Sequence, residues 1–177
     1  MTRFVALLYS ISLNDGARLK MEPFRQFAEG LGLANPRTVL STGNLIFDSA
    51  ARSAPKLTAM LEVAFAERFG RRIDIIVRSG KDWQRLAAAN PFVDLPDSEA
   101  SRIGVRVMRE PLTAQARAYL ASKVTGTEKL VVVDGDPWMH FADKVAGTPL
   151  ANALGSRRIG AGTMRNLNCV RKIAAAL

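Results

Sequence analysis

The order of the predicted elements constrains the fold of this chain more than any other feature of its sequence. The continuous apolar run Phe4–Leu8 is typical of a buried central strand, and apolar residues at helical spacing follow over 24–31. The pattern then predicts two strands on either side of Ser41–Asn44, a helix over 54–69 and a strand at Ile73–Val77. This order of strand, helix, strand, strand, helix and strand is that of a ferredoxin-like, or split β-α-β, unit.

The same order begins again in the second half of the chain. A strand is predicted at Ile103–Val107, a helix after Thr113, and a hairpin around Asp134–Pro137. The closing segment Leu167–Leu177 has the pattern of a helix and takes the place of a fourth strand. We therefore predict an α+β fold of two ferredoxin-like (split β-α-β) units, the second lacking its final strand and ending in a helix.

The predicted division has three parts. They are a first unit at 1–79, a helix and connector at 80–101, and a second unit with a basic C-terminal helix at 102–177. In a ferredoxin-like unit the first two strands run parallel with the third between them. The loop Ser10–Lys20 and the turn Ser41–Asn44 should therefore emerge at one end of the first sheet, where sites often lie.

The scarcity of histidine and cysteine excludes several classes of site. The chain of 177 residues has one His and one Cys, which excludes an internal disulfide and a zinc site of the usual His/Cys type. We expect no metal and no cofactor. A Ser-His or Cys-His catalytic pair would have to use His140. No apolar run approaches the ~20 residues of a membrane span, so we expect no membrane association and a cytoplasmic location.

Positive charge is concentrated at the C-terminal end. The chain has 25 Lys and Arg against 16 Asp and Glu, a formal charge of +9, and no acid follows Asp143. The basic residues beyond that point are Lys144, Arg157, Arg158, Arg165, Arg171 and Lys172. One interpretation is a surface for an anionic ligand or nucleic acid. The candidates for that surface are Arg157, Arg158, Arg171 and Lys172. The other is a solvated face balanced by acids from elsewhere, such as Asp94, Asp97 and Glu99.

Several segments together resemble a known family. They are Phe4–Leu8, the helix at Met21, Ser41–Asn44 before Leu45–Phe47, Asn90–Phe92, and Thr163–Asn166 before the terminal helix. The chain is similar, over essentially its whole length, to the family known as domain of unknown function 1697. The resemblance implies an α+β fold of ferredoxin-like units and no established activity, substrate or cofactor. Family members typically follow the first strand with Arg-Gly-Ile-Asn, whereas this chain has Tyr9–Ser12, so a site in that loop would be altered.

The candidate ligand-binding residues come from two segments. They are Thr42, Gly43, Asn44, Thr163, Arg165 and Asn166. A glycine-rich turn before a helix, as at Gly160–Asn166, can present N–H groups to an anion. The structural alternative is that Gly43 and Asn44 make the hairpin turn and that Arg165 and Asn166 cap or anchor the terminal helix.

The remaining candidates favour structural roles. We expect His140 to be a satisfied strand residue rather than a general base, Cys169 to pack within a helix, and Asp134 and Asp136 to serve a turn rather than a metal. The function we favour is a non-catalytic module that binds a phosphate-containing ligand or nucleic acid. The alternatives are an enzyme acting on a small phosphorylated or carboxylated substrate, and a structural protein whose exposed sheet edges pair in a homodimer.

Overall fold

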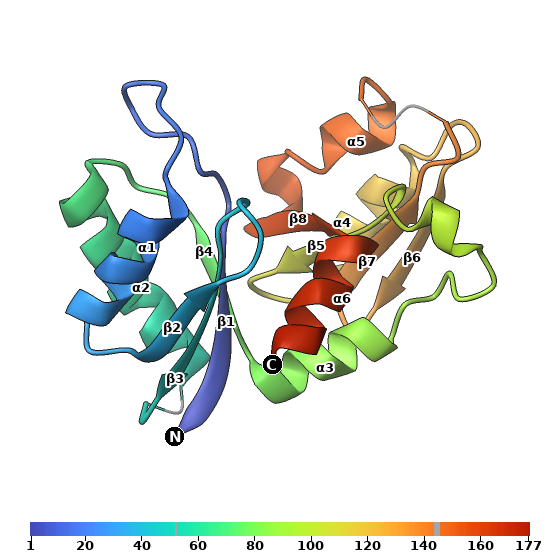
Figure 1. Cartoon of the computed structure of the whole chain (residues 1–177). Helices are drawn as coiled ribbons and strands as arrows, with labels where there is room; N and C mark the ends of the chain where they lie inside the picture. The colour runs from blue at the N-terminus through green and yellow to red at the C-terminus, as the bar shows by residue number, and fades with distance from the viewer. Residues whose placement is uncertain (52, 144–145) are drawn as a thin grey trace. The chain divides into compact units, whose positions relative to one another are not determined.

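The computed structural model describes residues 1–51, 53–143 and 146–177 (Figure 1). These residues form two compact units. Unit 1 comprises residues 1–87 together with 172–177, and unit 2 comprises residues 88–171. Each unit contains a four-stranded sheet in which neighbouring strands are antiparallel, and helices complete a mixed α+β fold. None of the described helices is long and apolar enough to cross a membrane.

Unit 1 alternates strands and helices in the predicted order. Its elements are β1 (Thr2–Leu8), α1 (Met21–Gly30), β2 (Ala34–Thr38), β3 (Asn44–Ser49), α2 (Ala54–Phe69), β4 (Ile75–Ser79) and α3 (Gly80–Ala88). The strand order in the sheet is β2-β3-β1-β4. Because β1 and β2 are both antiparallel to β3, which lies between them, these two strands run parallel to each other. The loop after β1 and the turn after β2 therefore leave the same end of the sheet.

Strand β1 is buried on both of its faces. Phe4, Ala6 and Leu8 point to one face and belong to a core built with α1 and α2. Val5 and Leu7 point to the opposite face and are also inaccessible to solvent. A strand that is buried on both faces has no polar positions to alternate with, which explains the continuous apolar run in the sequence.

Helix α2 begins and ends at the residues that the sequence predicts. The Ser53 side chain accepts a hydrogen bond from the Lys56 N–H (3.4 Å), and a proline follows in the first turn. Gly70 adopts a left-handed conformation (φ +68°) and ends the helix. The chain then turns back and enters β4, so the segment 71–74 and α2 become neighbours in space.

Unit 2 repeats the strand order of unit 1. Its elements are η1 (Asp97–Glu99), β5 (Ile103–Met108), α4 (Ala114–Ala121), β6 (Lys129–Val133), β7 (Asp136–His140), α5 (Pro149–Ala153), η2 (Arg157–Ile159), β8 (Gly162–Asn166) and α6 (Leu167–Ala176). The strand order in this sheet is β6-β7-β5-β8. The division between the units falls within α6, whose last residues, from Lys172, group with unit 1.

The prediction that the second unit lacks its final strand is wrong. Strand β8 pairs antiparallel with β5, from Gly104 opposite Asn166 to Met108 opposite Gly162. The sequence pattern does not predict this strand because Thr163 and Arg165, rather than apolar residues, occupy its buried positions. The helix predicted after it is present as α6.

The first strand of the predicted hairpin around Ser41–Asn44 is also displaced. The apolar pair Val39–Leu40 suggested a strand, but β2 ends at Thr38 and Leu40 lies in the turn with φ +60°. Strand β2 is at the edge of the sheet, contains Pro36, and pairs with β3 in an interrupted register. An edge strand needs little apolar surface, so its sequence carries a weak signal.

Candidate functional site

The turn before β3 packs closely against the segment that follows β1. The Leu8 N–H donates to the Gly43 carbonyl (2.9 Å). Gly43 has φ +75°, and a Cβ added there would lie 2.8 Å from Ile11 Cγ2 and 2.9 Å from Leu8 Cβ. The expected closeness of these two loops is therefore confirmed, and only glycine fits at the point where they meet.

Asn44 holds this turn from within. Its side chain is inaccessible to solvent, and its Nδ2 donates to the Val39 carbonyl (2.8 Å) and to Thr42 Oγ1 (2.9 Å). Thr42 itself is exposed. A ligand at this end of the sheet would meet the Thr42 side chain, whereas Asn44 would support the turn beneath it.

Thr163 and Arg165 lie on one face of β8, and both are buried. Arg165 Nη1 donates to Thr163 Oγ1 (2.9 Å) and to the Met164 carbonyl (2.7 Å). Burial lowers the pKa of Arg165 to about 10, because the charged guanidinium loses solvation there. Asn166 is exposed, and its Oδ1 accepts a hydrogen bond from the Cys169 N–H (2.9 Å) at the start of α6.

The six predicted ligand-binding residues are thus divided between the units. Thr42, Gly43 and Asn44 belong to unit 1, and Thr163, Arg165 and Asn166 belong to unit 2. Within the groups, Asn44 contacts Thr42 and Arg165 contacts Thr163. A single site that combines both groups stays a prediction.

The basic residues after Asp143 have different surroundings. Arg165 is buried, and Arg171 forms an ion pair with Asp97 (2.9 Å), one of the acids expected to balance the segment. Lys172 is exposed in unit 1. Lys144 lies outside the described residues. Burial therefore removes Arg165 from any surface, whereas the exposed residues Arg157, Arg158, Arg171 and Lys172 stay predictions for an anion surface.

A basic cluster does form around Tyr119, on the side of α4 near η2. The Arg158 guanidinium carbon lies 5.3 Å from the centre of the Tyr119 ring, and Lys123 Nζ lies 5.4 Å from it. Arg157, the neighbour of Arg158 on η2, is exposed. We call Tyr119, Lys123, Arg157 and Arg158 the Tyr119 cluster. Among residues 1–51, 53–143 and 146–177, no carboxylate pairs with any of its three cations.

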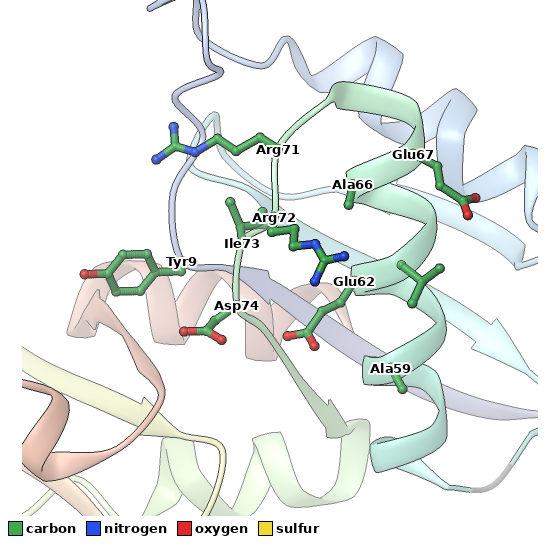
Figure 2. Close-up of a pocket in the computed structure, with 10 residues that line it drawn as sticks. Tyr9, Ala59, Glu62, Ala66, Glu67, Arg71, Arg72, Ile73 and Asp74 are labelled. Atoms are coloured by element: carbon green, nitrogen blue, oxygen red, sulfur yellow. The ribbon is translucent and has the colours of Figure 1, made fainter.

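A cavity of about 680 Å³ opens beside α2 in unit 1 (Figure 2). One wall is the face of α2 that includes Glu62, and the other is the segment Arg71–Asp74 with Tyr9 at the rim. Two hydrogen bonds fix the walls. Glu62 Oε1 accepts from the Ile75 N–H (2.8 Å), and the Tyr9 N–H donates to the Asp74 carbonyl (2.9 Å). The volume lies in the range of small-molecule sites.

His140 is a paired residue of strand β7. It is buried, and its Nε2 lies 2.8 Å from Glu99 Oε2. The hydrogen bond from His140 is the main reason that the pKa of Glu99 lies below its ordinary value of 4.5. The ring is satisfied only in part, because its Nδ1 is buried without a hydrogen-bond partner among the described residues. Cys169 is buried in α6.

The two aspartates near the β6–β7 hairpin serve the backbone. Asp134 (φ +50°) and Gly135 (φ +89°) make the two-residue turn. Asp136 is buried, and its Oδ1 accepts from the Met108 N–H (2.7 Å). In the described part of the chain, no group of three or more His, Cys, Asp and Glu side chains could hold a metal ion.

Comparison with known sequences identifies the family. The family model described as "Protein of unknown function (DUF1697)" matches residues 1–138, more than three quarters of the chain. The chain belongs to the DUF1697 family. The expected resemblance is confirmed, although the segment Thr163–Asn166 lies beyond the part that the DUF1697 model matches.

One solved structure is similar over nearly the whole chain. It is the conserved bacterial protein SP0830 from Streptococcus pneumoniae, with a TM-score of 0.76 and 24% sequence identity, over 98% of this chain and 97% of that one. At this identity the likeness shows the fold alone, and it supports the predicted α+β class for this DUF1697 protein. No curated protein matches the sequence.

The sequence analysis did not predict the cavity, and of the Tyr119 cluster it named only Arg157 and Arg158. A signal for the cavity was present: Ala59, Glu62 and Ala66 are three and four positions apart, so they share one face of α2, and two of the three are small. For the cluster, the signal was Tyr119 and Lys123 at i and i+4 around the end of α4. Tyr9, at the cavity rim, begins the segment Tyr9–Ser12, where the family resemblance led us to expect other residues.

Proposed function

We propose that this DUF1697 protein is a non-catalytic module that binds a phosphate-bearing partner through the Tyr119 cluster. The observation that carries the proposal is the convergence of Lys123 and Arg158 on one aromatic ring, with Arg157 adjacent and no carboxylate partner among the described residues. The two cations come from segments far apart in the sequence, so composition alone does not account for their meeting.

The chemistry of the cluster suits a phosphate group. Arg158 offers a planar set of donors that can hold two phosphate oxygens, and Lys123 adds a point charge. The Tyr119 ring attracts both cations, each contact contributing about 0.5–1 kcal/mol at an exposed site, and so offsets part of their mutual repulsion. A bound phosphate would remove the rest of that repulsion, which favours occupation of the cluster by a polyanion.

We also infer that both units have ferredoxin-like topology. The support in unit 1 is the order β1-α1-β2-β3-α2-β4 together with the sheet order β2-β3-β1-β4. In unit 2, strands β5, β6, β7 and β8 occupy the corresponding positions, and α5 with η2 stands between the last two strands. The topology bears on function because it places connecting loops at the ends of a rigid sheet.

The test is a fluorescence-anisotropy titration of the full chain with labelled duplex and single-stranded oligonucleotides. Three neutralised phosphates predict a log K against log salt slope of about −2.7 for duplex DNA and about −2.1 for a single strand. The duplex affinity should then fall about 40-fold between 50 and 200 mM salt. Competition by free nucleotides or inorganic phosphate distinguishes a small phosphorylated ligand from a nucleic-acid backbone.

A matched pair of triple variants makes the test specific to the cluster. Lys123→Gln with Arg157→Gln and Arg158→Gln should abolish binding of every phosphate-bearing probe. The control variant replaces three exposed cations of unit 1, Arg18, Lys20 and Lys56, with Gln, and so changes the net charge equally. The control should retain binding. Equal loss in both variants, or no binding by the natural chain at 25 mM salt, would overturn the proposal.

A further inference from the structure

We propose that α4 of unit 2 binds in the major groove of a B-form DNA duplex, with basic residues on its two flanks contacting the two phosphate backbones. This inference rests on the proposed phosphate-binding function, because the Tyr119 cluster supplies one of the two flanks. It goes further by naming the class of partner and by adding a second contact surface. The support comes from the placement of charge around α4 and from the residues on its exposed side.

Positive charge lies on both flanks of α4. Arg117 and Tyr119 are two positions apart, so about 200° of helical rotation separates them and they lie on opposite flanks. Between the flanks on the inner side, Ala116 and Leu120 are buried in the core of unit 2. The Tyr119 flank carries the Tyr119 cluster, and the other flank carries Arg117. With side chains a helix is about 10–12 Å across, so a single phosphate group cannot contact both flanks.

The Arg117 side chain is held along its flank and remains available to an anion. It is exposed, and its Nε donates to the Leu112 carbonyl (3.3 Å). Among residues 1–51, 53–143 and 146–177, no carboxylate pairs with its guanidinium. The contact with Leu112 restrains the side chain, so less conformational freedom is lost when the other donors of the guanidinium bind a phosphate.

The exposed side of α4 between the flanks consists of small or uncharged residues, which we call its outer face. They are Ala114, Gln115, Ala118, Ala121 and Ser122. The whole segment 111–127 contains no Asp or Glu. In the sequence, the acids on either side of this segment are Glu110 and Glu128, beyond the two ends of the helix. A polyanion that lies across the outer face would therefore meet no carboxylate along the helix itself.

The dimensions of the helix match those of the DNA major groove. The groove of B-form DNA is about 12 Å wide, and a phosphate backbone borders it on each side. A helix in this groove brings its two flanks to opposite backbones and its outer face to the base edges. Arg117 would then bind one strand, and Lys123 with Arg158 the other. Because alanines dominate the outer face, few base-specific contacts form and the binding depends little on DNA sequence.

The same residues argue against other polyanionic partners. Helices that bind an anionic membrane insert large apolar side chains, whereas the outer face of α4 carries alanine, glutamine and serine. Proteins that bind single strands stack bases on aromatic rings, but Lys123 and Arg158 already contact the ring of Tyr119. The major groove of duplex RNA is deep and narrow, so a helix cannot enter it. Duplex DNA is the partner that fits all three features.

The experiment compares a DNA duplex, the RNA duplex of the same sequence and one DNA strand by fluorescence anisotropy of the full chain over a salt series. With Arg117 added to the three cations of the Tyr119 cluster, about four phosphates are neutralised, and the slope for duplex DNA should be about −3.6. Arg117→Gln should return this slope to about −2.7 and leave RNA binding unchanged. Tighter binding of the RNA duplex, of the single strand or of phosphatidylserine vesicles than of duplex DNA would overturn the proposal.

A matched pair of glutamate variants tests the position of α4 directly. Ala118→Glu places a carboxylate in the middle of the outer face and should abolish binding of duplex DNA. Ala59→Glu makes the same change at an exposed alanine of α2 in unit 1 and should leave binding unchanged. Binding that resists both Arg117→Gln and Ala118→Glu, but is lost in the triple variant of the Tyr119 cluster, would refute the groove position while the proposed function stands. Binding that survives the triple variant would refute both.

Discussion

Replacing Gly43 with alanine tests how tightly the turn before β3 is held against the residues after β1. Gly43 has φ +75°, in the left-handed region, where a side chain costs about 1–2 kcal/mol. The new Cβ would also lie 2.8 Å from Ile11 Cγ2 and 2.9 Å from Leu8 Cβ, both closer than carbon atoms pack. Overpacking of this kind typically costs about 1–3 kcal/mol. We therefore expect Gly43→Ala to lower the free energy of unfolding by about 2–5 kcal/mol.

Gly70→Ala is the matched control for the backbone contribution. Gly70 has φ +68°, and nothing lies within 4 Å of a Cβ added there, so it carries the conformational cost without the steric one. Urea unfolding of both variants gives their free energies of unfolding from the midpoints at a shared m-value. Gly43→Ala should be the less stable variant by about 1–3 kcal/mol, the steric part alone.

A double-mutant cycle identifies the contact responsible. Ile11→Ala removes the Cγ2 atom that the new Cβ would approach, so combining it with Gly43→Ala should recover part of the steric loss. Equal stabilities of the two glycine variants within about 0.5 kcal/mol, together with additive behaviour in the cycle, would refute the close packing. The loop after β1 would then be free to move away from the turn.

Two further perturbations probe hydrogen-bonded carboxylates in unit 2. Asp136→Ala removes the acceptor of the buried Met108 N–H and should cost about 1–3 kcal/mol in urea unfolding, and no loss would mean that another acceptor replaces it. Glu99 has its pKa lowered below 4.5, mainly by the hydrogen bond from His140, so its ionised form stabilises the fold above that pH. That stabilisation is lost as the pH falls through the lowered pKa. Glu99→Gln should therefore flatten the decline of thermal stability on the acid side, and an unchanged acid limb would contradict the pairing.

The elements that the sequence predicted correctly have signals that depend on residues close together in the chain. Strand β1 is buried on both faces, so its apolar run is unbroken. Helix α2 has a capping serine and a terminal glycine, and each signal depends on only a few neighbouring residues. The Asp134–Gly135 turn of the β6–β7 hairpin follows the same rule, because positive φ values are needed at both positions.

The strands that were missed or displaced are edge strands. Strand β2 and strand β8 each pair with one neighbour, at the end of their sheet. Their hydrogen bonds come from the partner strand, and their side chains include proline, glycine and buried polar residues such as Thr163 and Arg165. Each of these strands forms because it pairs with a strand distant in the sequence, so no pattern among neighbouring residues predicts it. The cavity beside α2 was missed for the same reason, because its second wall comes from another segment.

The basic residues that lie close together in the sequence are also not the same as those that meet in the structure. This contrast leads to a last prediction. The basic segment after Asp143 includes Arg171, whose charge is offset by Asp97, whereas Lys123 lies outside that segment and has no acidic partner among the described residues. If convergence rather than sequence position makes the anion surface, Lys123→Gln should weaken oligonucleotide binding and reduce the salt slope by about 1.

Arg171→Gln removes the same charge from the chain but should leave both the affinity and the salt slope unchanged, since a paired exposed cation has little attraction left for a phosphate. Anisotropy titrations of the two variants over the same salt series measure this contrast directly. If Arg171→Gln weakened binding more than Lys123→Gln did, the anion would bind at the terminal helix. The Tyr119 cluster would then have only a structural role. Because the two variants share one net charge, a difference between them reports where the anion binds rather than how much positive charge the chain carries.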